Sequence, residues 1–332
     1  MPKVTIGLPT FNRALTLERT IAYILNQTFS DFEVLIYDDG STDDTSISAK
    51  KFTDSRISFY SFPNQGPPAP LNFILDNAQG EYIIFLHDHD HFREDLLEKC
   101  VDSLDTNPTV GFVLPGGITI SENQNIIQDP EKPPHEFQYV NDGNLFLHKS
   151  LEAKSFESKF HACSMVRATS MQLIGNKYET KYGFYSDVEL WLRLLNSFDF
   201  IYIDDVLIQF TAREDDHILN GNEILIMNSL YEIHFDIVQK FFSNSSNEYI
   251  KSLQKRYFND LLWTVINIVS NKRPNSTEQM NQIEINYINN RLKFFTLQVL
   301  RSSIGLKLLP MLKRLYKYTI HKLIVFKSAI SR

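Results

Sequence analysis

The chain has 332 residues, of which 43% are hydrophobic and 22% are charged, so it can form one large domain with an appendage or two domains. This balance is ordinary for a globular protein and argues against a largely disordered chain. The formal net charge of −7 hides an asymmetry, because residues 285–332 carry ten Lys and Arg and no Asp or Glu, whereas 23 basic and 40 acidic residues precede them.

The chain contains two cysteines, Cys100 and Cys163, so no disulfide framework is expected and a reducing compartment fits. The first ten residues lack the long apolar segment of a signal peptide. No stretch of 18 apolar residues occurs, so no membrane-spanning helix is expected. These features predict a cytoplasmic protein.

The N-terminal part alternates short apolar strands with amphipathic helices. The predicted strands lie at 3–9, 32–38, 56–62, 81–86 and 110–116. The predicted helices begin near 17 and after 42, and span 71–78 and 94–104. Such alternation is typical of an α/β fold with a mostly parallel, Rossmann-like sheet and helices on both faces.

The second half predicts a different organisation. A helix is expected at 187–196 and a strand at 200–210, and after about Asn222 the pattern is helical to the end. We therefore expect an α/β domain at 1–218 and a helical C-terminal region at 219–332.

Two polar clusters follow predicted strands. Asp38 and Asp39 end one strand, and the sequence HDHDH, residues 87–91, ends another. Ligands of parallel α/β sheets bind at the carboxyl ends of the strands, so both clusters indicate a binding site.

The second cluster can hold a divalent cation. On an extended segment alternate residues point the same way, so Asp88 and Asp90 can face an ion together; alternatively, His87, His89 and His91 can do so. A solvated loop without a metal is the simpler alternative.

Three segments resemble family 2 glycosyltransferases. They are VTIGLPTFNRALTLERTIAYILNQTFSDFEVLIYDDGSTDDT, GEYIIFLHDHDHF and YSDVELWLRL, which fall in the family's order over roughly residues 3–215. The resemblance implies that 1–218 is a GT-A domain. It also implies a nucleotide-diphosphate-sugar donor, a divalent metal such as Mn²⁺ or Mg²⁺, and inversion at the anomeric carbon.

By position, the resemblance implies a nucleotide pocket lined by Pro9, Thr10, Asn12 and Arg13. Asp39, with Asp38 beside it, would bond the base. A carboxylate accepts the imide N–H of uracil or thymine, so a UDP- or dTDP-sugar is favoured. Helix capping in the DDGST turn is the simpler alternative for both aspartates.

The family's Asp-x-Asp motif falls on His87, Asp88 and His89, so histidine stands at both aspartate positions. Asp90 matches a frequent following aspartate. The predicted ligands are Asp88, His89 and Asp90: either His89 acts with Asp88 or Asp90, or the motif is shifted by one residue. Manganese accepts a nitrogen ligand better than magnesium does.

The third segment implies that Asp187 is the general base, which takes the proton of the acceptor hydroxyl. An acidic residue at a helix N-terminus also interacts with the helix dipole, which is the simpler alternative. The family usually has Glu at the position of Ser186, so this match is altered.

Further donor contacts are expected from other polar residues. Asn72 keeps the second position of an Arg-Asn pair that is frequent in the family, and Leu71 replaces the arginine. Arg193, Arg213 and His217 are further candidates for the diphosphate.

After Pro310 the sequence MLKRLYKYTIHKLIVFK predicts a basic amphipathic helix. Such a helix can lie on an anionic membrane surface, or pack on the acidic body or on a second subunit. Because relatives of this kind act on polyprenyl-diphosphate-linked acceptors, we expect a peripheral protein at the inner face of the cell membrane.

The leading hypothesis is an inverting, metal-dependent glycosyltransferase that builds a bacterial surface polysaccharide on a lipid-linked glycan, with no nucleic acid as partner. A nucleotidyltransferase is an alternative, but LPTFNRALT lacks the glycines of a triphosphate-binding loop. A non-catalytic scaffold on the same fold is the other alternative, because both motif aspartates are replaced.

Overall fold

The computed structural model describes residues 1–121, 126–128, 139–147 and 163–212, and five positions between 232 and 240. The chain divides into two compact units, Met1–Glu214 and Asp215–Arg332. The fold described here is that of the first unit. The basic tail after Pro310 lies outside the described residues.

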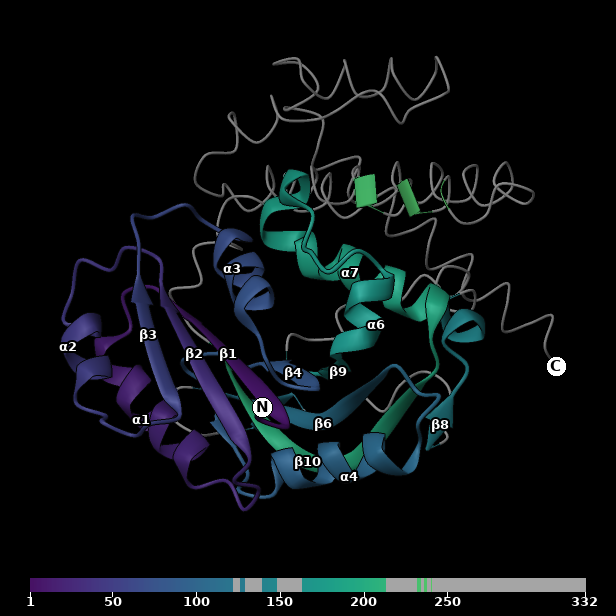
Figure 1. Cartoon of the computed structure of the whole chain (residues 1–332), viewed down its shortest axis with the longest axis horizontal. Helices are drawn as coiled ribbons and strands as arrows, with labels where there is room; N and C mark the ends of the chain where they lie inside the picture. The colour runs from purple at the N-terminus through teal and green to yellow at the C-terminus, as the bar shows by residue number, and fades with distance from the viewer. Residues whose placement is uncertain are drawn as a thin grey trace, which may run out of the picture. The chain divides into compact units, whose positions relative to one another are not determined.

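One mixed sheet forms the centre of the first unit (Figure 1). Its strands are β1 (Val4–Thr10), β2 (Phe32–Asp38), β3 (Ile57–Ser61), β4 (Tyr82–Phe85), β5 (His91–Phe92), β6 (Phe112–Ser121), β7 (Ile126–Gln128), β8 (Val140–Asn141), β9 (Met165–Arg167) and β10 (Phe200–Ala212). The α-helices are α1 (Ala14–Leu25), α2 (Thr45–Lys50), α3 (Ala69–Asn77), α4 (Leu96–Thr106), α6 (Ala168–Leu173) and α7 (Ser186–Ser197), and a 3₁₀ helix, η1 (Thr180–Tyr185), precedes α7.

The strands are ordered β3-β2-β1-β4-β9-β6-β10-β5 across the sheet, with β7 beside β6 and β8 beside β10. β1 to β4 are parallel, and β6 is parallel to β10. The short strand β9 runs antiparallel between β4 and β6. The predicted α/β fold with a mostly parallel sheet is confirmed. β6 and β10 extend beyond their predicted ends because they pair with each other along their lengths.

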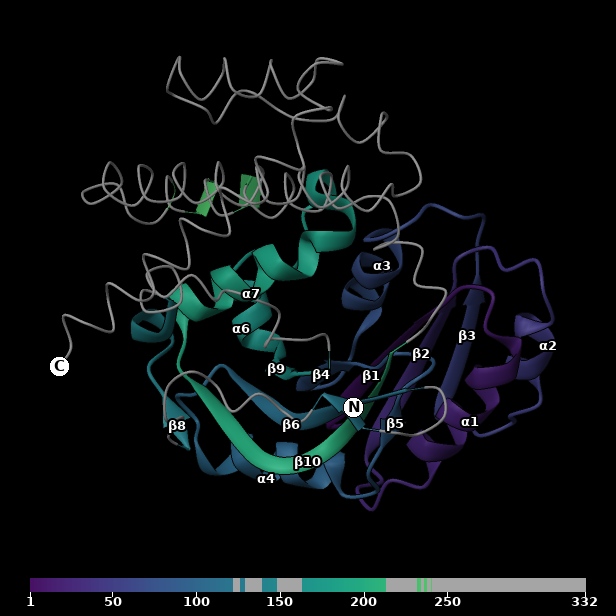
Figure 2. The same ribbon diagram turned by 180° about the vertical axis from the view of Figure 1, so that it is seen from behind.

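Helices cover both faces of the sheet (Figures 1 and 2). Alternate residues of β1, namely Val4, Ile6 and Leu8, are fully buried in one core cluster with apolar residues of α1 and α4. On the opposite face Gly7 allows α3 to approach, because a Cβ there would lie 2.8 Å from the Ile74 side chain. The alternating residues of β1 are therefore packed on both faces of the sheet, against α1 and α4 on one face and against α3 on the other.

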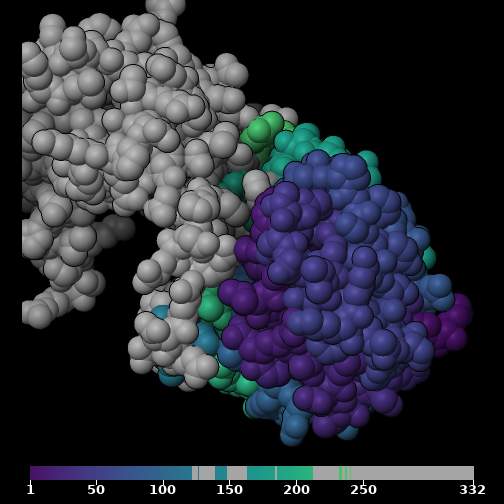
Figure 3. Space-filling view, turned by 90° about the vertical axis from the view of Figure 1, so that its left-hand side faces the viewer, coloured from purple at the N-terminus to yellow at the C-terminus, as the bar shows by residue number. Residues whose placement is uncertain are grey.

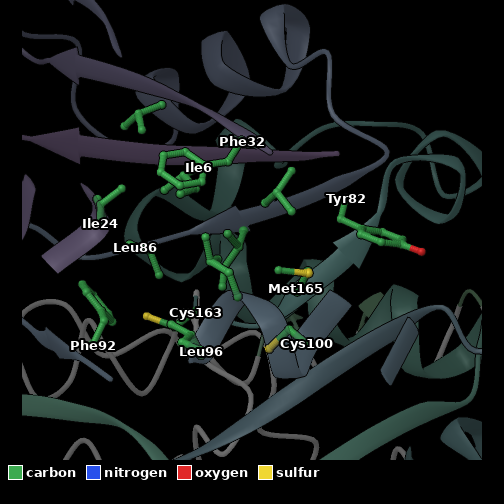
Figure 4. Packing of buried hydrophobic residues seen from close by; sticks show 14 of the residues in the cluster. Ile6, Ile24, Phe32, Tyr82, Leu86, Phe92, Leu96, Cys100, Cys163 and Met165 are labelled. Carbon is green, nitrogen blue, oxygen red and sulfur yellow. The ribbon is translucent and has the colours of Figure 1, made fainter. Parts of the chain in front are cut away.

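Figure 4 shows the packing of this cluster, with Ile6 and Ile24 near Phe32, and with both cysteines among the buried side chains. Cys100 and Cys163 are free thiols with no exposed surface. Burial raises the pKa of each thiol. Both cysteines therefore serve as small apolar core residues.

A polar network ties the amino edge of the sheet, opposite the ends discussed below. Lys3 lies 2.8 Å from carboxylate oxygens of both Glu81 and Asp105. Tyr82 donates its hydroxyl hydrogen bond to Asp105, and Arg167 reaches the Tyr82 hydroxyl at 3.2 Å. The network thus joins β1, β4, α4 and β9 at their ends.

The side of the unit that carries the edge strand β3 and helix α2, at the left of Figure 1, faces the viewer in Figure 3, where the N-terminal part of the chain forms the surface. In the part of the chain that the structure describes, no helix has the length and apolar character needed to cross a membrane.

Candidate functional site

The carboxyl ends of β1, β2 and β4 lie side by side and form what we call the carboxyl edge. β1 pairs in parallel with β2 up to Thr10 opposite Asp38, and with β4 on its other side. The ends of these strands and the segments that follow them hold residues 10–13, 38–39 and 87–91. The structure thus brings the predicted polar groups together at one edge, as parallel pairing requires.

The turn after β1 is fastened to the turn after β2. Asn12 has a φ of 53°, and its Oδ1 accepts a hydrogen bond from the Thr42 N–H at 2.8 Å. The N–H groups of Asn12 and Arg13 donate to the hydroxyls of Ser41 and Thr45, each at 2.8 Å. The two turns therefore form one rigid unit.

Other residues of the predicted pocket lie in this unit. Pro9 is half-buried in β1, and the carbonyl of Thr10 accepts the N–H of Asp39 at 3.0 Å. Within the described residues, the buried hydroxyl of Thr10 has no hydrogen-bond partner. Nε of Arg13 lies 3.5 Å from Oδ1 of Asp88, so Arg13 connects this turn with the 87–91 segment.

Asp38 anchors the surrounding turns. Its Oδ1 accepts the Ser41 N–H at 3.0 Å, and its Oδ2 accepts the hydroxyls of Ser46 at 3.2 Å and Ser61 at 3.0 Å. Only 1% of its surface is exposed. Asp38 therefore holds the turns around the pocket in place, and its oxygens are not open to a ligand.

Asp39 holds the segment that follows β3. Its two carboxylate oxygens accept the N–H groups of Gln65 at 2.8 Å and Gly66 at 2.9 Å. Gly40 has a φ of 78°, and a Cβ there would lie 2.6 Å from the main-chain nitrogen of Asn64. Each carboxylate oxygen of Asp39 keeps a second lone pair that can accept a further hydrogen bond. The contact of Asp39 with a nucleotide base stays a prediction.

Residues 87–91 form the His/Asp cluster, which consists of His87, Asp88, His89, Asp90 and His91. β4 ends at Phe85, and residues 88 and 89 form a turn, with the Asp90 N–H 3.5 Å from the His87 carbonyl. The segment is therefore not extended, and alternate residues do not share a side. Instead the turn places His87 Nδ1 2.9 Å from Asp90 Oδ2.

Three members of the His/Asp cluster can share a cation. One donor atom from each of His87, His89 and Asp90 lies within 4.8 Å of the others. Asp88 is outside this group, and its Oδ1 contacts His89 Nδ1 at 3.0 Å. The set predicted from the sequence was Asp88, His89 and Asp90, so the structure has His87 where the sequence suggested Asp88.

His91 also points elsewhere. Its Nδ1 lies 3.3 Å from the hydroxyl of Tyr23, and the two rings are 5.3 Å apart. Burial, together with the charge of Arg19, lowers the pKa of His91. The alternative in which three histidines face one ion is therefore not the arrangement found.

His87 and Asp90 each favour the charged form of the other. Burial opposes the charge of His87, but its hydrogen bond to Asp90 and the charges of Asp88 and Asp187 outweigh burial, so the pKa of His87 is raised. Burial likewise opposes the charge of Asp90, but His87 and the N–H of Thr211 hold its pKa below the ordinary value. An imidazole and a carboxylate of this kind form a charge-assisted pair.

Asp187 lies at the beginning of α7, as predicted. Burial raises the pKa of its carboxyl group above the usual value, while the Val188 N–H, 2.8 Å from Oδ1, and the charge of His87 act in the opposite direction. Asp187 and His87 thus influence each other's protonation. A carboxylate with a raised pKa close to a charged cluster is a suitable general base.

Asn72 does not present its amide to the carboxyl edge. Its Nδ2 donates to the Tyr178 carbonyl at 3.0 Å, and its Oδ1 accepts the Tyr178 N–H at 2.8 Å. Both polar atoms are therefore occupied, and the geometry assigns Asn72 to holding the segment before η1 against α3.

Arg193 is enclosed in a similar way. Its Nε lies 2.8 Å from Glu189 Oε1, and its two Nη atoms donate to the carbonyls of Ile174 and Lys177 at 2.6 and 2.7 Å. Both charged side chains of this pair are about 4% exposed. Arg193 is thus a structural residue, while Arg213 and His217 lie outside the described residues.

Thr211 is the site residue that the sequence did not indicate. Its N–H donates to Asp90 Oδ1 at 2.8 Å, and its hydroxyl donates to the His89 carbonyl at 3.1 Å. The only sequence signal for this contact is that the predicted strand at 200–210 lies directly before it. A separation of 121 residues hides the pairing itself.

A model of the family described as "Glycosyl transferase family 2" matches residues 5–172. Among curated proteins, the chain is 38% identical over 116 residues to a GalNAc(5)-diNAcBac-PP-undecaprenol beta-1,3-glucosyltransferase of Campylobacter jejuni, which covers 34% of this chain and 36% of that protein. It is 32% identical over 131 residues to a chondroitin synthase of Escherichia coli, which covers 39% of this chain and 19% of that protein. The matches thus span about a third or less of these relatives.

Among solved structures, the S. aureus TarS 1-349 crystal structure in complex with UDP has a TM-score of 0.61 to this chain at 16% identity. The match covers 93% of this chain and 87% of that one. This likeness shows that the fold is shared.

Proposed function

Because the chain belongs to glycosyl transferase family 2, we propose that it is an inverting glycosyltransferase that moves a sugar from a nucleotide-diphosphate-sugar donor to an acceptor hydroxyl. The observation that carries this proposal is the position of Asp187. Asp187 lies in the first turn of α7, burial raises the pKa of its carboxyl group, and the charge of His87 acts against that rise.

In this mechanism Asp187 accepts the proton of the acceptor hydroxyl as its oxygen attacks the anomeric carbon. A new glycosidic bond forms on one face of the sugar. The bond to the diphosphate breaks on the other face, and its electron pair leaves with the diphosphate. One displacement of this kind inverts the anomeric carbon.

The donor site is proposed at the joined turns of the carboxyl edge. Thr10, Asn12 and Arg13 line it, and Asp39, held in place by two N–H groups, accepts the imide N–H of a uracil or thymine base. A UDP- or dTDP-sugar is therefore the proposed donor. The TarS crystal structure in complex with UDP supports a uridine nucleotide as a ligand of this fold.

The chemistry of the donor set, two imidazoles and one carboxylate within 4.8 Å, fits a divalent cation. His87, His89 and Asp90 would hold it. When bound, Mn²⁺ or Mg²⁺ supplies positive charge that neutralises the departing diphosphate.

The proposed acceptor is a glycan carried by a polyprenyl diphosphate, in the synthesis of a bacterial surface polysaccharide. The name of the Campylobacter relative, which includes PP-undecaprenol, supports this class of acceptor. The ten basic residues of 285–332 support a peripheral attachment to an anionic membrane.

The test is a transfer and donor-hydrolysis assay with UDP- and dTDP-sugars, with and without Mn²⁺. Asp187→Asn should abolish transfer while leaving nucleotide binding in place. Asp76→Asn, which makes the same change at an exposed position of α3, serves as the control. If Asp187→Asn transfers sugar at the rate of the control variant, the proposed role of Asp187 is wrong.

A further inference from the structure

We infer that His87, His89 and Asp90 form a preorganised, nitrogen-rich cation site that binds a transition-metal ion of the Co²⁺ or Zn²⁺ type in preference to Mg²⁺, and does so without a nucleotide. The site belongs to the active site of the proposed function, and the inference rests on that function for its biological meaning only. The binding itself follows from the geometry of the described residues.

The first support is the spacing of the donor atoms. Asp90 lies between the two imidazoles, with Oδ2 2.9 Å from His87 Nδ1 and Oδ1 3.8 Å from His89 Nε2. Tetrahedral coordination with bonds of 2.0–2.1 Å puts neighbouring ligand atoms about 3.4 Å apart. The two observed separations lie on either side of this value, so small side-chain rotations suffice to receive an ion.

The second support is the fixation of the donors from outside the turn. Asp90 accepts the Thr211 N–H at 2.8 Å. The His89 carbonyl accepts the Thr211 hydroxyl at 3.1 Å and a guanidinium N–H of Arg19 at 3.2 Å. Because these contacts exist before an ion enters, binding needs little ordering of the chain, and no nucleotide is required to assemble the ligands.

The third support is the position of Asp88. Its Oδ1 lies 3.0 Å from His89 Nδ1. This contact orients the ring and leaves Nε2 as the nitrogen that can bind the ion. A carboxylate behind a metal-binding histidine is a frequent arrangement and raises the basicity of the ring. Asp88 therefore acts as a positioning residue for His89, and not as a ligand.

The choice of ion follows from donor type and charge. Imidazole suits zinc, cobalt and related ions, whereas Mg²⁺ prefers oxygen ligands and keeps much of its water. Two neutral imidazoles and one carboxylate carry a charge of −1, whereas two carboxylates carry −2. A divalent ion in this site thus keeps a net positive charge, which favours an anionic diphosphate as its further ligand.

The experiment is equilibrium dialysis of the metal-free full-length chain against Co²⁺, Zn²⁺, Mn²⁺ or Mg²⁺ alone, without nucleotide. The visible spectrum of bound Co²⁺ reports nitrogen ligands. We expect one equivalent of Co²⁺ or Zn²⁺, bound at least about 100-fold more tightly than Mg²⁺. Equal affinity for Co²⁺ and Mg²⁺, or a Co²⁺ spectrum without nitrogen ligands, would overturn the inference.

Variants assign the binding to named residues. His87→Asn and His89→Asn should each abolish the Co²⁺ spectrum, and Asp88→Asn should weaken binding about 10–100-fold. His91→Asn, which changes a neighbouring imidazole outside the set, should bind Co²⁺ like the unmodified chain. Unchanged Co²⁺ binding in both His87→Asn and His89→Asn would contradict the assignment.

A double variant, His87→Asp with His89→Asp, distinguishes a lost ligand from a misfolded chain, because a folded double variant should still bind a metal ion. It restores two carboxylates, and we expect it to bind Mg²⁺ while losing its preference for Co²⁺. A retained preference for Co²⁺ would overturn the inference. Transfer activity is measured separately, so a chain that binds Co²⁺ at this site but transfers no sugar overturns the proposed function alone.

Discussion

The main-chain N–H of Thr211 donates a 2.8 Å hydrogen bond to Oδ1 of Asp90, which precedes it by 121 residues. The bond joins the turn that follows β4 to the carboxyl end of β10. Asp90 is 1% exposed, so this hydrogen bond is shielded from bulk water. The His/Asp cluster is thus held from a distant part of the chain.

We expect Asp90→Ala to lower the free energy of unfolding by about 1–3 kcal/mol, because it leaves the Thr211 N–H without its acceptor. Asp90→Asn keeps an oxygen at this position and should lose less. Urea unfolding followed by circular dichroism measures both. Asp76→Ala, at an exposed position of α3, should stay within about 0.5 kcal/mol of the unmodified chain.

The pH profile of transfer should reflect the raised pKa of Asp187. A general base must be deprotonated, so kcat/KM falls as the pH falls through the pKa of that base in the free enzyme. Burial raises this pKa above the ordinary 3.8. The acidic limb should therefore lie above pH 3.8, in a pH range where circular dichroism shows intact folding, and a limb at or below that value would contradict the assignment of Asp187.

Asn72→Asp should destabilise the fold and leave nucleotide affinity unchanged, because Asn72 contacts the Tyr178 main chain with both polar atoms. The carboxylate loses the donor to the Tyr178 carbonyl, and we expect a loss of about 1–3 kcal/mol. Asn77→Asp in the same helix also removes a donor to a carbonyl, that of Phe73, but at an exposed position, and is the matched control. A UDP dissociation constant that rises tenfold or more for folded Asn72→Asp would instead support a direct donor contact.

Removal of one partner from the buried Glu189–Arg193 pair should be severe. Arg193→Met leaves the carboxylate of Glu189 buried without its cation, and such losses amount to about 3–5 kcal/mol. The double variant with Glu189→Leu should be more stable than Arg193→Met alone, although the carbonyls of Ile174 and Lys177 still lose their donor. Additive losses in a double-mutant cycle would show that the pair is not coupled.

The basic tail should attach the chain to anionic vesicles. Each Lys or Arg near such a surface contributes about 1 kcal/mol, and salt weakens the attraction. The full-length chain should therefore co-sediment with vesicles that contain phosphatidylglycerol, and less so at high salt. Co-sedimentation that persists after removal of the residues beyond Pro310 would assign the attachment to another part of the chain.

The sequence predicted the sheet because its strands have simple patterns. The apolar run that ends at Asp38 places the end of β2 correctly, and the alternation of Val4, Ile6 and Leu8 places β1 to within one residue at each end. Local pattern also placed Asp187 at the start of a helix. In each case the signal lies within a few neighbouring residues.

The arrangement of the His/Asp cluster could not be predicted in the same way. The alternation rule assumes an extended chain, whereas a turn at 88–89 brings His87 to Asp90. The anchoring of Asp90 by Thr211 depends on strand pairing far away in the chain. Likewise, the sequence showed Asn72 as an available amide, and only the fold places Tyr178 beside it.

The amino edge of the sheet bears on how this site can change over time. Lys3, Glu81, Tyr82, Asp105 and Arg167 hold β1, β4, α4 and β9 together at the end remote from the His/Asp cluster. Mutations at the carboxyl edge therefore leave this network intact. Such a separation lets the residues of the carboxyl edge vary while the contacts that fix the other end of the sheet are retained.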